Sequence, residues 1–240
     1  LDKLTVKAEE TPLAAGTDYT AAFDDNGYVN IVVIPGGAGD SATSLTVSGV
    51  QIDPTAVTPA DIVGAVTADG VESGMEVRQI FPKLNMTPGI LLAPGWSENA
   101  LVSAGLQAKT SHINGVFNCV CIVDIDSSTA GATKYDDVKR QKEKQAVTSA
   151  NCYAVWLYAK VGDVIYAGSA MAAAATVATD ANNGDIPNVS PDNKPISISA
   201  ACLKDGTEVL LDQEQANVVN SFGVATWLNM NGFRLWGNNT

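Results

Sequence analysis

Long apolar runs, histidine and charge are all scarce in this 240-residue chain. No run of 18 apolar residues occurs, so we expect no membrane-spanning helix and no membrane insertion. The only histidine is His112, which excludes sites that need two imidazoles. Charged residues make up 17% of the chain and leave a net charge of −12, whereas about 25% is usual in soluble domains. We therefore expect no nucleic-acid binding, and a surface partly covered by neighbouring molecules.

Cysteine pairs with metal-binding or redox spacing are also absent. The four cysteines (Cys119, Cys121, Cys152 and Cys202) contain no Cys-x-x-Cys pair, and a single histidine cannot complete a zinc site with them. They stand in apolar runs that look like strands. We expect buried, reduced thiols and no metal or other cofactor.

Residues 1–55 carry the pattern of a small all-β domain, a sandwich or barrel-like module. Asn26-Gly27 is a strong hairpin signal between two of its apolar runs. Residues 36–39 lack the Lys and Ser/Thr of a phosphate loop, so we interpret them as a hairpin loop. Two lysines and nine acidic residues through Ile62 give the region a net charge of −7. The expected strands are 4–6, 18–23, 28–34 and 45–50.

Residues 56–240 alternate apolar runs with helical patterns, which predicts an α/β domain. Residues 89–94 and 116–123 are near-continuous apolar runs, which predicts parallel strands in a sheet covered on both faces. Ser97 is expected to cap the helix between them, and Asn114-Gly115 to end it. Further helices are expected after Thr58 and at 69–81, 134–147, 168–179 and 212–222, and further strands at 151–159, 196–203, 207–211, 224–228 and 233–236. Asp212 is expected to cap the last of these helices, and 233–236 to be the hairpin partner of 224–228.

A Ser-His-Asp hydrolase would need Ser169, His112 and a strand-end acid. Ser169 begins a helix in a segment that faintly resembles the nucleophile region of subtilisin-like proteases. His112 falls at the end of a helix, whereas those proteases place their histidine at a helix start. The chain order also differs from theirs, because the strand-end acids Asp124 and Asp126 follow His112 and none precedes it. We therefore expect capping and packing roles and no enzyme, with a degenerate serine hydrolase or another α/β ligand binder as the alternative.

Asp124 and Asp126 also end an apolar strand, where the ligand sites of α/β folds usually lie. A divalent ion could bind there with help from Ser127 or Thr129. A capped turn is the other interpretation and the favoured one, so no metal site is predicted.

Five of the 14 basic residues fall in the expected helix at 134–147. Acidic residues are interspersed among them and no aromatic residues accompany them, which disfavours a nucleic-acid patch. They form either a solvated face or an assembly contact for an acidic neighbour. Such a neighbour could be the region through Ile62 of another copy, which has a net charge of −7. These residues are Lys134, Lys139, Arg140, Lys142 and Lys144.

The end of the chain resembles a family signature. Residues 232–240 end in Trp236, Gly237, Asn238, Asn239 and Thr240, and are similar to the Trp-Gly-Asn-Arg-Thr region of contractile-tail sheath proteins of bacteriophages and phage-like particles. Asn239 stands where that family has Arg. Other stretches resemble the family in the same order and together span nearly the whole chain. They are residues 16–19, 25–27, 58–64, 88–95 and 190–194.

The resemblance implies a small β-sandwich domain at 1–55 and a catalytically inactive, subtilisin-like α/β domain at 56–240. It implies a structural subunit whose copies form helical rings around the inner tail tube protein and contract to drive the tube through a target cell envelope. The location implied is the virion tail, assembled in the host bacterial cytoplasm. Family members extend beyond both ends of the matched region, so we expect a truncated or protease-resistant core that is monomeric by itself.

Overall fold

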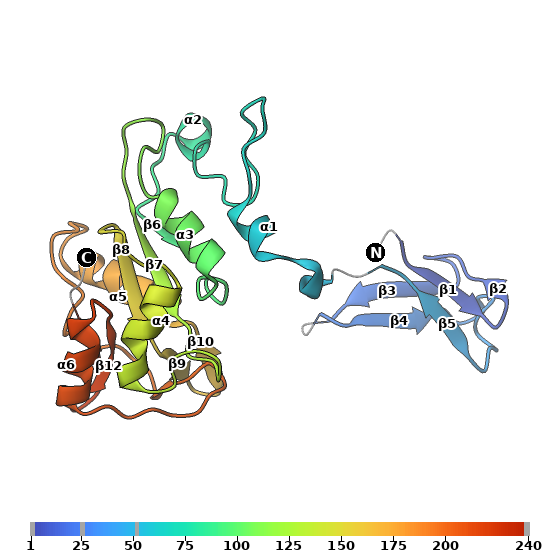
Figure 1. Cartoon of the computed structure of the whole chain (residues 1–240). Coiled ribbons are helices and arrows are strands. Elements are labelled where there is room, and N and C mark those ends of the chain that lie inside the picture. Colours follow the sequence, from blue (N-terminus) through green and yellow to red (C-terminus); the bar gives the residue numbers. More distant parts are fainter. Residues whose placement is uncertain (1–2, 25–26, 51–52, 238–240) are drawn as a thin grey trace. The chain divides into compact units, whose positions relative to one another are not determined.

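The computed structural model describes residues 3–24, 27–50 and 53–237 (Figure 1). Contacts divide the chain into two compact units, Leu1–Ala56 and Val57–Thr240. This division falls one residue after the end of the first predicted domain. Each unit has a hydrophobic core of its own.

The N-terminal unit is built from two small antiparallel sheets. One sheet has the strand order β2-β1-β5 and the other is the β3–β4 hairpin. This hairpin confirms the interpretation of Asn26-Gly27, although Asn26 itself lies outside the described residues. The core of the unit is small and consists of Val6, Ala8, Leu13 and Tyr19. The strands are β1 (Thr5–Ala8), β2 (Thr11–Pro12), β3 (Tyr19–Phe23), β4 (Val29–Val33) and β5 (Leu45–Ser48).

The loop at 36–39 is not a hairpin loop, because β4 and β5 belong to different sheets. The carboxylate of Asp18 holds it by accepting the backbone N–H groups of Ala14 and Ala38, both at 2.8 Å. These backbone donors lower the pKa of Asp18. A Cβ on Gly37 would lie 2.8 Å from the Cα of Asp18, so glycine permits this close approach.

The C-terminal unit contains the predicted parallel sheet, in the order β6-β7-β8. Ile90 pairs with Val120, and Cys121 pairs with Cys152. Ala225 extends the sheet beyond β8 through a parallel bridge to Val155. The parallel pairing follows from the near-continuous apolar runs, which are stable only where both faces are covered. The strands are β6 (Ile90–Leu92), β7 (Val120–Ile125) and β8 (Cys152–Trp156).

Helices cover this sheet (Figure 1). The helices α3 (Ala100–Ala108), α4 (Val138–Lys144) and α5 (Gly168–Asn182) all contact β7. The helix α6 (Gln213–Ser221) packs against β12 (Thr226–Asn229). Asp212 caps α6 in a capping box with Gln215, as the sequence predicts.

Smaller sheets complete the unit. The predicted strand at 151–159 is broken at Leu157, whose φ of 85° ends β8. The strand β9 (Tyr158–Val161) then pairs with β10 (Val164–Tyr166) and with β11 (Ala200–Cys202). The predicted hairpin of β12 with β13 (Phe233–Trp236) is confirmed. The predicted strand at 207–211 is wrong, since that stretch contributes only the isolated bridge from Glu208 to Cys202.

The predicted helix at 69–81 is also wrong. Residues 65–73 fold back on themselves, with Ser73 N donating to Ala65 O at 2.9 Å. Gly70 and Gly74 have positive φ, which favours turns and interrupts a helix. Only α2 (Ile80–Leu84) is helical in this region. A helix of the same length, α1 (Pro59–Val63), begins at the expected cap Thr58.

Two other helices are shorter than predicted. Asn99, rather than Ser97, caps α3, and the helix ends at Ala108. It does not reach the predicted end at Asn114, because His112 and Asn114 have positive φ. The predicted helix at 134–147 is a 3-10 turn (Tyr135–Asp137) followed by α4, and Ala146 with a φ of 54° lies just beyond it.

All four cysteines are free and buried, as the sequence predicts. In the part of the chain that the structure describes, no helix is long and apolar enough to cross a membrane.

Candidate functional site

Asp124 is the centre of a buried polar cluster at the carboxyl end of β7. Its side chain is 2% exposed and accepts three hydrogen bonds. Ser169 donates both its backbone N–H, at 2.7 Å, and its Oγ–H, at 2.6 Å. Ser97 donates its Oγ–H at 2.8 Å and accepts the N–H of Asp124 at 2.9 Å. The cluster therefore joins the loop after β6, the end of β7 and the start of α5.

The local sequence explains this arrangement. A carboxylate at the N-terminus of α5 satisfies a free helix N–H and faces the positive end of the helix dipole. Gly168 allows the start of α5 to lie close to the backbone just after β8, because a Cβ there would lie 2.4 Å from Leu157 O. Burial raises the pKa of Asp124, and the hydrogen bonds from Ser169 and Ser97 oppose that shift.

The structure does not assemble a catalytic triad. Ser169 binds Asp124 directly, so no imidazole stands between the serine and the carboxylate, and Ser169 is fully buried. His112 is exposed and lies in the turn between α3 and β7. That turn leads into the amino end of β7, whereas Asp124 lies near its carboxyl end. Asp124 accepts the N–H and the hydroxyl of Ser169 at the start of α5, and both residues are buried, which agrees with the expected capping and packing.

The divalent-ion interpretation of Asp124 and Asp126 finds no support in the geometry. Asp124 is occupied by its three donors, and Asp126 accepts the N–H of Ser128 at 2.9 Å in a turn. Ser127 instead accepts the N–H of Lys204 at 3.1 Å, while Thr129 is exposed. Among the described residues, no group of three or more His, Cys, Asp or Glu side chains is arranged to hold a metal ion.

Two further polar groups border this cluster, and sequence reasoning missed both. Gln145 is 1% exposed, and its amide donates to Asp124 O at 2.9 Å and accepts from Asp126 N at 2.9 Å. Glu98 pairs with Lys204 and accepts the hydroxyl of Tyr158 at 2.8 Å. Burial raises the pKa of Glu98. No spacing rule could find these contacts, because the partners come from distant parts of the chain.

The five basic residues at 134–144 do not share one exposed face. Lys142 points inward, and its ammonium donates to Phe222 O at 2.9 Å and Gly223 O at 3.0 Å at the C-terminal end of α6. Burial lowers its pKa. An exposed face that includes Lys142 is therefore a wrong expectation. Lys134, Lys139, Arg140 and Lys144 are exposed.

The exposed charges of this segment are mixed. Arg140 binds Asp137 at 2.7 Å, and Asp136 and Glu143 also lie on the surface. The four exposed cations are accompanied by three carboxylates, so any attraction for an acidic neighbour is modest.

The signature at the end of the chain is embedded in the C-terminal unit. Trp236 donates its indole N–H to Asn217 of α6 at 2.9 Å. Gly237 donates its N–H to Asp192 at 2.7 Å and accepts the hydroxyl of Tyr153. Asn238, Asn239 and Thr240 lie outside the described residues. The signature residues that are described thus join α6, β8 and the loop at 190–195.

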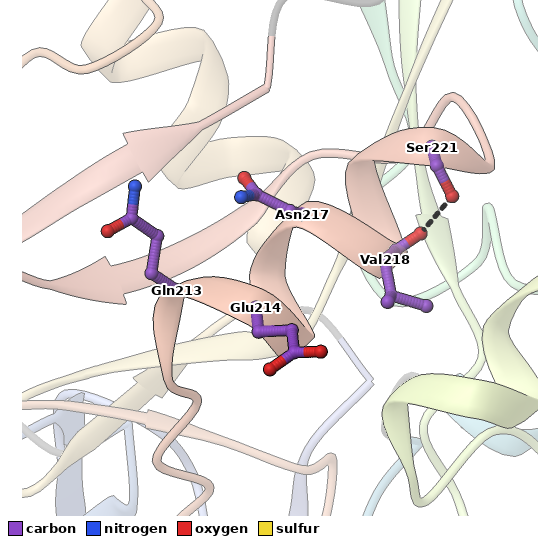
Figure 2. A pocket seen from close by; sticks show the side chains of 5 residues that line it. All are labelled: Gln213, Glu214, Asn217, Val218 and Ser221. Atoms are coloured by element: carbon purple, nitrogen blue, oxygen red, sulfur yellow. Dashed lines mark hydrogen bonds between the residues drawn. The ribbon is translucent and has the colours of Figure 1, made fainter.

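The outer face of α6 borders a shallow hollow of about 520 Å³ (Figure 2). Its lining comes from this one helix and is mostly polar. Asn217 is already bound by Trp236, and Ser221 donates to Val218 O within the helix. The hollow holds no convergent set of groups that would define a ligand. The lining residues are Gln213, Glu214, Asn217, Val218 and Ser221.

Comparison with known proteins identifies the class to which this chain is related. It is 26% identical over 247 residues to the tail sheath protein of Burkholderia phage BcepMu, covering 96% of this chain and 49% of that protein. It is 26% identical over 189 residues to a putative prophage major tail sheath protein of Pseudomonas aeruginosa strain UCBPP-PA14, covering 75% of this chain and 45% of that protein. No family model matches.

The chain is thus a relative of tail sheath proteins, which confirms the resemblance of its C-terminal signature. It spans about half the length of the relatives it matches. A chain in the solved baseplate of the anti-feeding prophage is similar over 78% of this chain and 50% of that chain, at 18% identity and a TM-score of 0.44.

Proposed function

We propose that this chain is part of the structural subunit of a contractile tail sheath. Copies of the subunit surround the inner tail tube in helical rings, and contraction drives the tube through the envelope of a target cell. The observation that carries the proposal is the match to a tail sheath protein across 96% of the chain. The expected place of the protein is the virion tail, after synthesis in the cytoplasm of the host bacterium.

Contraction needs rigid subunits that can exchange one set of intersubunit contacts for another, and it needs no catalysed reaction. The buried cluster at Asp124 supports this interpretation, since its serine and carboxylate bind one another and fix α5 to the sheet. The partners proposed are other sheath subunits and the inner tube protein. For the C-terminal unit we propose a subtilisin-like topology without a catalytic triad.

Electron microscopy tests the role directly. The complete polypeptide that carries this chain is produced together with the tube protein of the same particle. We expect hollow sheaths around tubes, in a long narrow state and a short wide state. Particles with tubes but without this polypeptide would contradict the proposal.

A fluorophosphonate probe tests the hydrolase alternative. Because Ser169 is fully buried and bound to Asp124, we expect no labelling of the native protein. Ser169→Ala serves as the control for background. Stoichiometric labelling at Ser169 would contradict a purely structural role.

A further inference from the structure

Two cysteines lie side by side on neighbouring strands of the parallel sheet (Figure 1). Cys121 of β7 and Cys152 of β8 are register partners, and Cys121 N donates to Asn151 O at 2.9 Å. Paired strands lie about 4.8 Å apart, and register partners point to the same face. A disulfide spans Cα atoms that are about 4.4–6.8 Å apart. The two thiols already share a hydrogen bond, so a bond between their sulfurs needs only a small movement of the side chains.

A small hollow gives access to this pair. Its volume is about 140 Å³, and Cys152 lines it together with Ser149 and Gly223. Cys152 is 6% exposed, whereas Cys121 is fully buried. One water molecule needs only about 10–15 Å³ of such space. A reagent of the size of hydrogen peroxide therefore fits beside Cys152, and a bulky reagent does not.

An ammonium group stands in the same hollow. Lys142 lines it, and Phe222 O and Gly223 O hold its Nζ. The hydrogen bond with Cys121, together with burial, raises the pKa of Cys152, and the charge of Lys142 opposes this shift. The hydrogen bond from Cys152 lowers the pKa of Cys121. The pair therefore loses its first proton more readily than a free cysteine and its second less readily, and the thiolate is the reactive form.

The other two cysteines lack this arrangement. Cys202 lies in a separate small cluster with Tyr158 and Ala167. Cys119 stands two residues before Cys121, a separation of about 6.6 Å along a strand, which is near the upper limit for a disulfide. Among the described residues, the only hydrogen bond between two thiols joins Cys121 and Cys152.

We propose that Cys121 and Cys152 form a redox-active pair, which a hydroperoxide entering the hollow converts to a disulfide between β7 and β8. The sulfur of Cys152 attacks one oxygen of hydrogen peroxide, the O–O bond breaks, and the other oxygen leaves as water with the thiol proton. The sulfur of Cys121 then attacks the sulfenic acid on Cys152, the S–O bond breaks, and a second water leaves with the second thiol proton. The two thiols are oxidised to one disulfide, and the peroxide is reduced to water.

The surroundings decide when this bond forms. The bacterial cytoplasm keeps such thiols reduced, whereas disulfides persist outside the cell. In a particle that is assembled in the cytoplasm and then released, the bond forms after assembly and ties β7 to β8 around the segment that contains α4. This timing rests on the proposed function, whereas the chemistry of the pair does not.

Peptide mapping by mass spectrometry tests the pair. The complete polypeptide that carries this chain is treated with hydrogen peroxide under native conditions, and we expect a disulfide between Cys121 and Cys152. Cys202→Ser is the control and should leave the yield unchanged, whereas Cys152→Ser should abolish the disulfide. Thiols that stay reduced in the native protein, overoxidation of Cys152 without a disulfide, or a bond from Cys121 to Cys119 would overturn the proposal.

A second hydroperoxide tests the route through the hollow. The rate of disulfide formation is measured with hydrogen peroxide and with tert-butyl hydroperoxide, and each rate is divided by the rate of the same reagent with glutathione. We expect the normalised rate to be at least about tenfold lower for the bulky reagent, because the hollow excludes it. Equal normalised rates would show that oxidation proceeds through opening of the fold and would overturn access through the hollow.

Neither measurement requires an assembled sheath. An absence of sheaths in the electron microscope contradicts the proposed function alone, and an absence of the disulfide contradicts this inference alone.

Discussion

The backbone N–H of Gly237 donates to the carboxylate of Asp192 at 2.7 Å, which joins two stretches 45 residues apart. Both stretches carry the resemblance to sheath proteins. Their neighbours reinforce the contact, since Asn193 N donates to Leu235 O at 2.7 Å and Leu235 N donates to Lys194 O at 3.2 Å. The described part of the signature, which ends at Gly237, therefore packs against the loop at 190–195.

We expect Asp192→Ala to destabilise the protein by about 1–3 kcal/mol, because it leaves a partly buried N–H without an acceptor. Denaturant unfolding of residues 1–240 measures this. Asp163→Ala, in the exposed β9–β10 turn, is the control and should change stability by less than about 0.5 kcal/mol. Equal stability of the two variants would show that the Asp192 contact contributes nothing.

Asp124 should make stability depend on pH. Burial raises its pKa, so the folded state binds the proton more tightly than the unfolded state. Stability from this group is therefore lost as pH rises above the ordinary aspartate value of about 4. Asp124→Asn keeps the shape and removes the ionisation.

We expect the stability of the native protein, relative to Asp124→Asn, to fall as pH rises from about 4 until it passes the raised pKa. Urea unfolding across pH 4–8 measures the difference. Asp124→Leu, which cannot accept the hydrogen bonds of Ser169, should be less stable than Asp124→Asn at every pH. A difference that is flat or rises with pH would contradict the assignment.

We expect Lys142 to contribute to the stability of the folded protein rather than to assembly. Its ammonium binds the carbonyls of Phe222 and Gly223, directly after α6, so Lys142→Met should lower the free energy of unfolding by about 1–3 kcal/mol. Lys139→Met changes an exposed residue of the same helix and should have an effect below about 0.5 kcal/mol. Thermal unfolding of the two variants side by side decides this, and a similar melting temperature would contradict the capping role.

Of the basic residues at 134–144, the exposed cations of α4 remain candidates for a contact with another subunit. We expect Lys139→Glu with Arg140→Glu to slow sheath assembly at low salt, with less effect at high salt, because exposed charges are screened. The control with the same change in net charge is Lys83→Glu with Lys194→Glu. Light scattering follows assembly, and equal rates for the two double variants would exclude a docking role for this face.

The sequence alone predicts those elements whose signals are local. The capping box of Asp212, the Asn26-Gly27 hairpin, the β12–β13 hairpin and the parallel pairing of β6 with β7 depend on residues close in the chain or on the apolar content of each strand. The signature around Trp236 also pointed to sheath proteins, and the comparisons confirm this.

Where local signals compete, the predictions made from the sequence are wrong. Residues 69–81 have helical spacing of apolar residues, but Gly70 and Gly74 take positive φ and the chain turns back instead. The run at 151–159 looks like one strand, yet Leu157 turns with positive φ between β8 and β9.

Only the tertiary structure decides how distant polar groups pair. Ser97 is spaced as a helix cap, but folding places it against Asp124, and Ser169 arrives at the same carboxylate from α5. Lys142 resembles its solvent-exposed neighbours in sequence and differs from them only because α6 ends beside it. A charged side chain takes the partner that burial leaves available, and that partner is set by the packing of elements far apart in the chain.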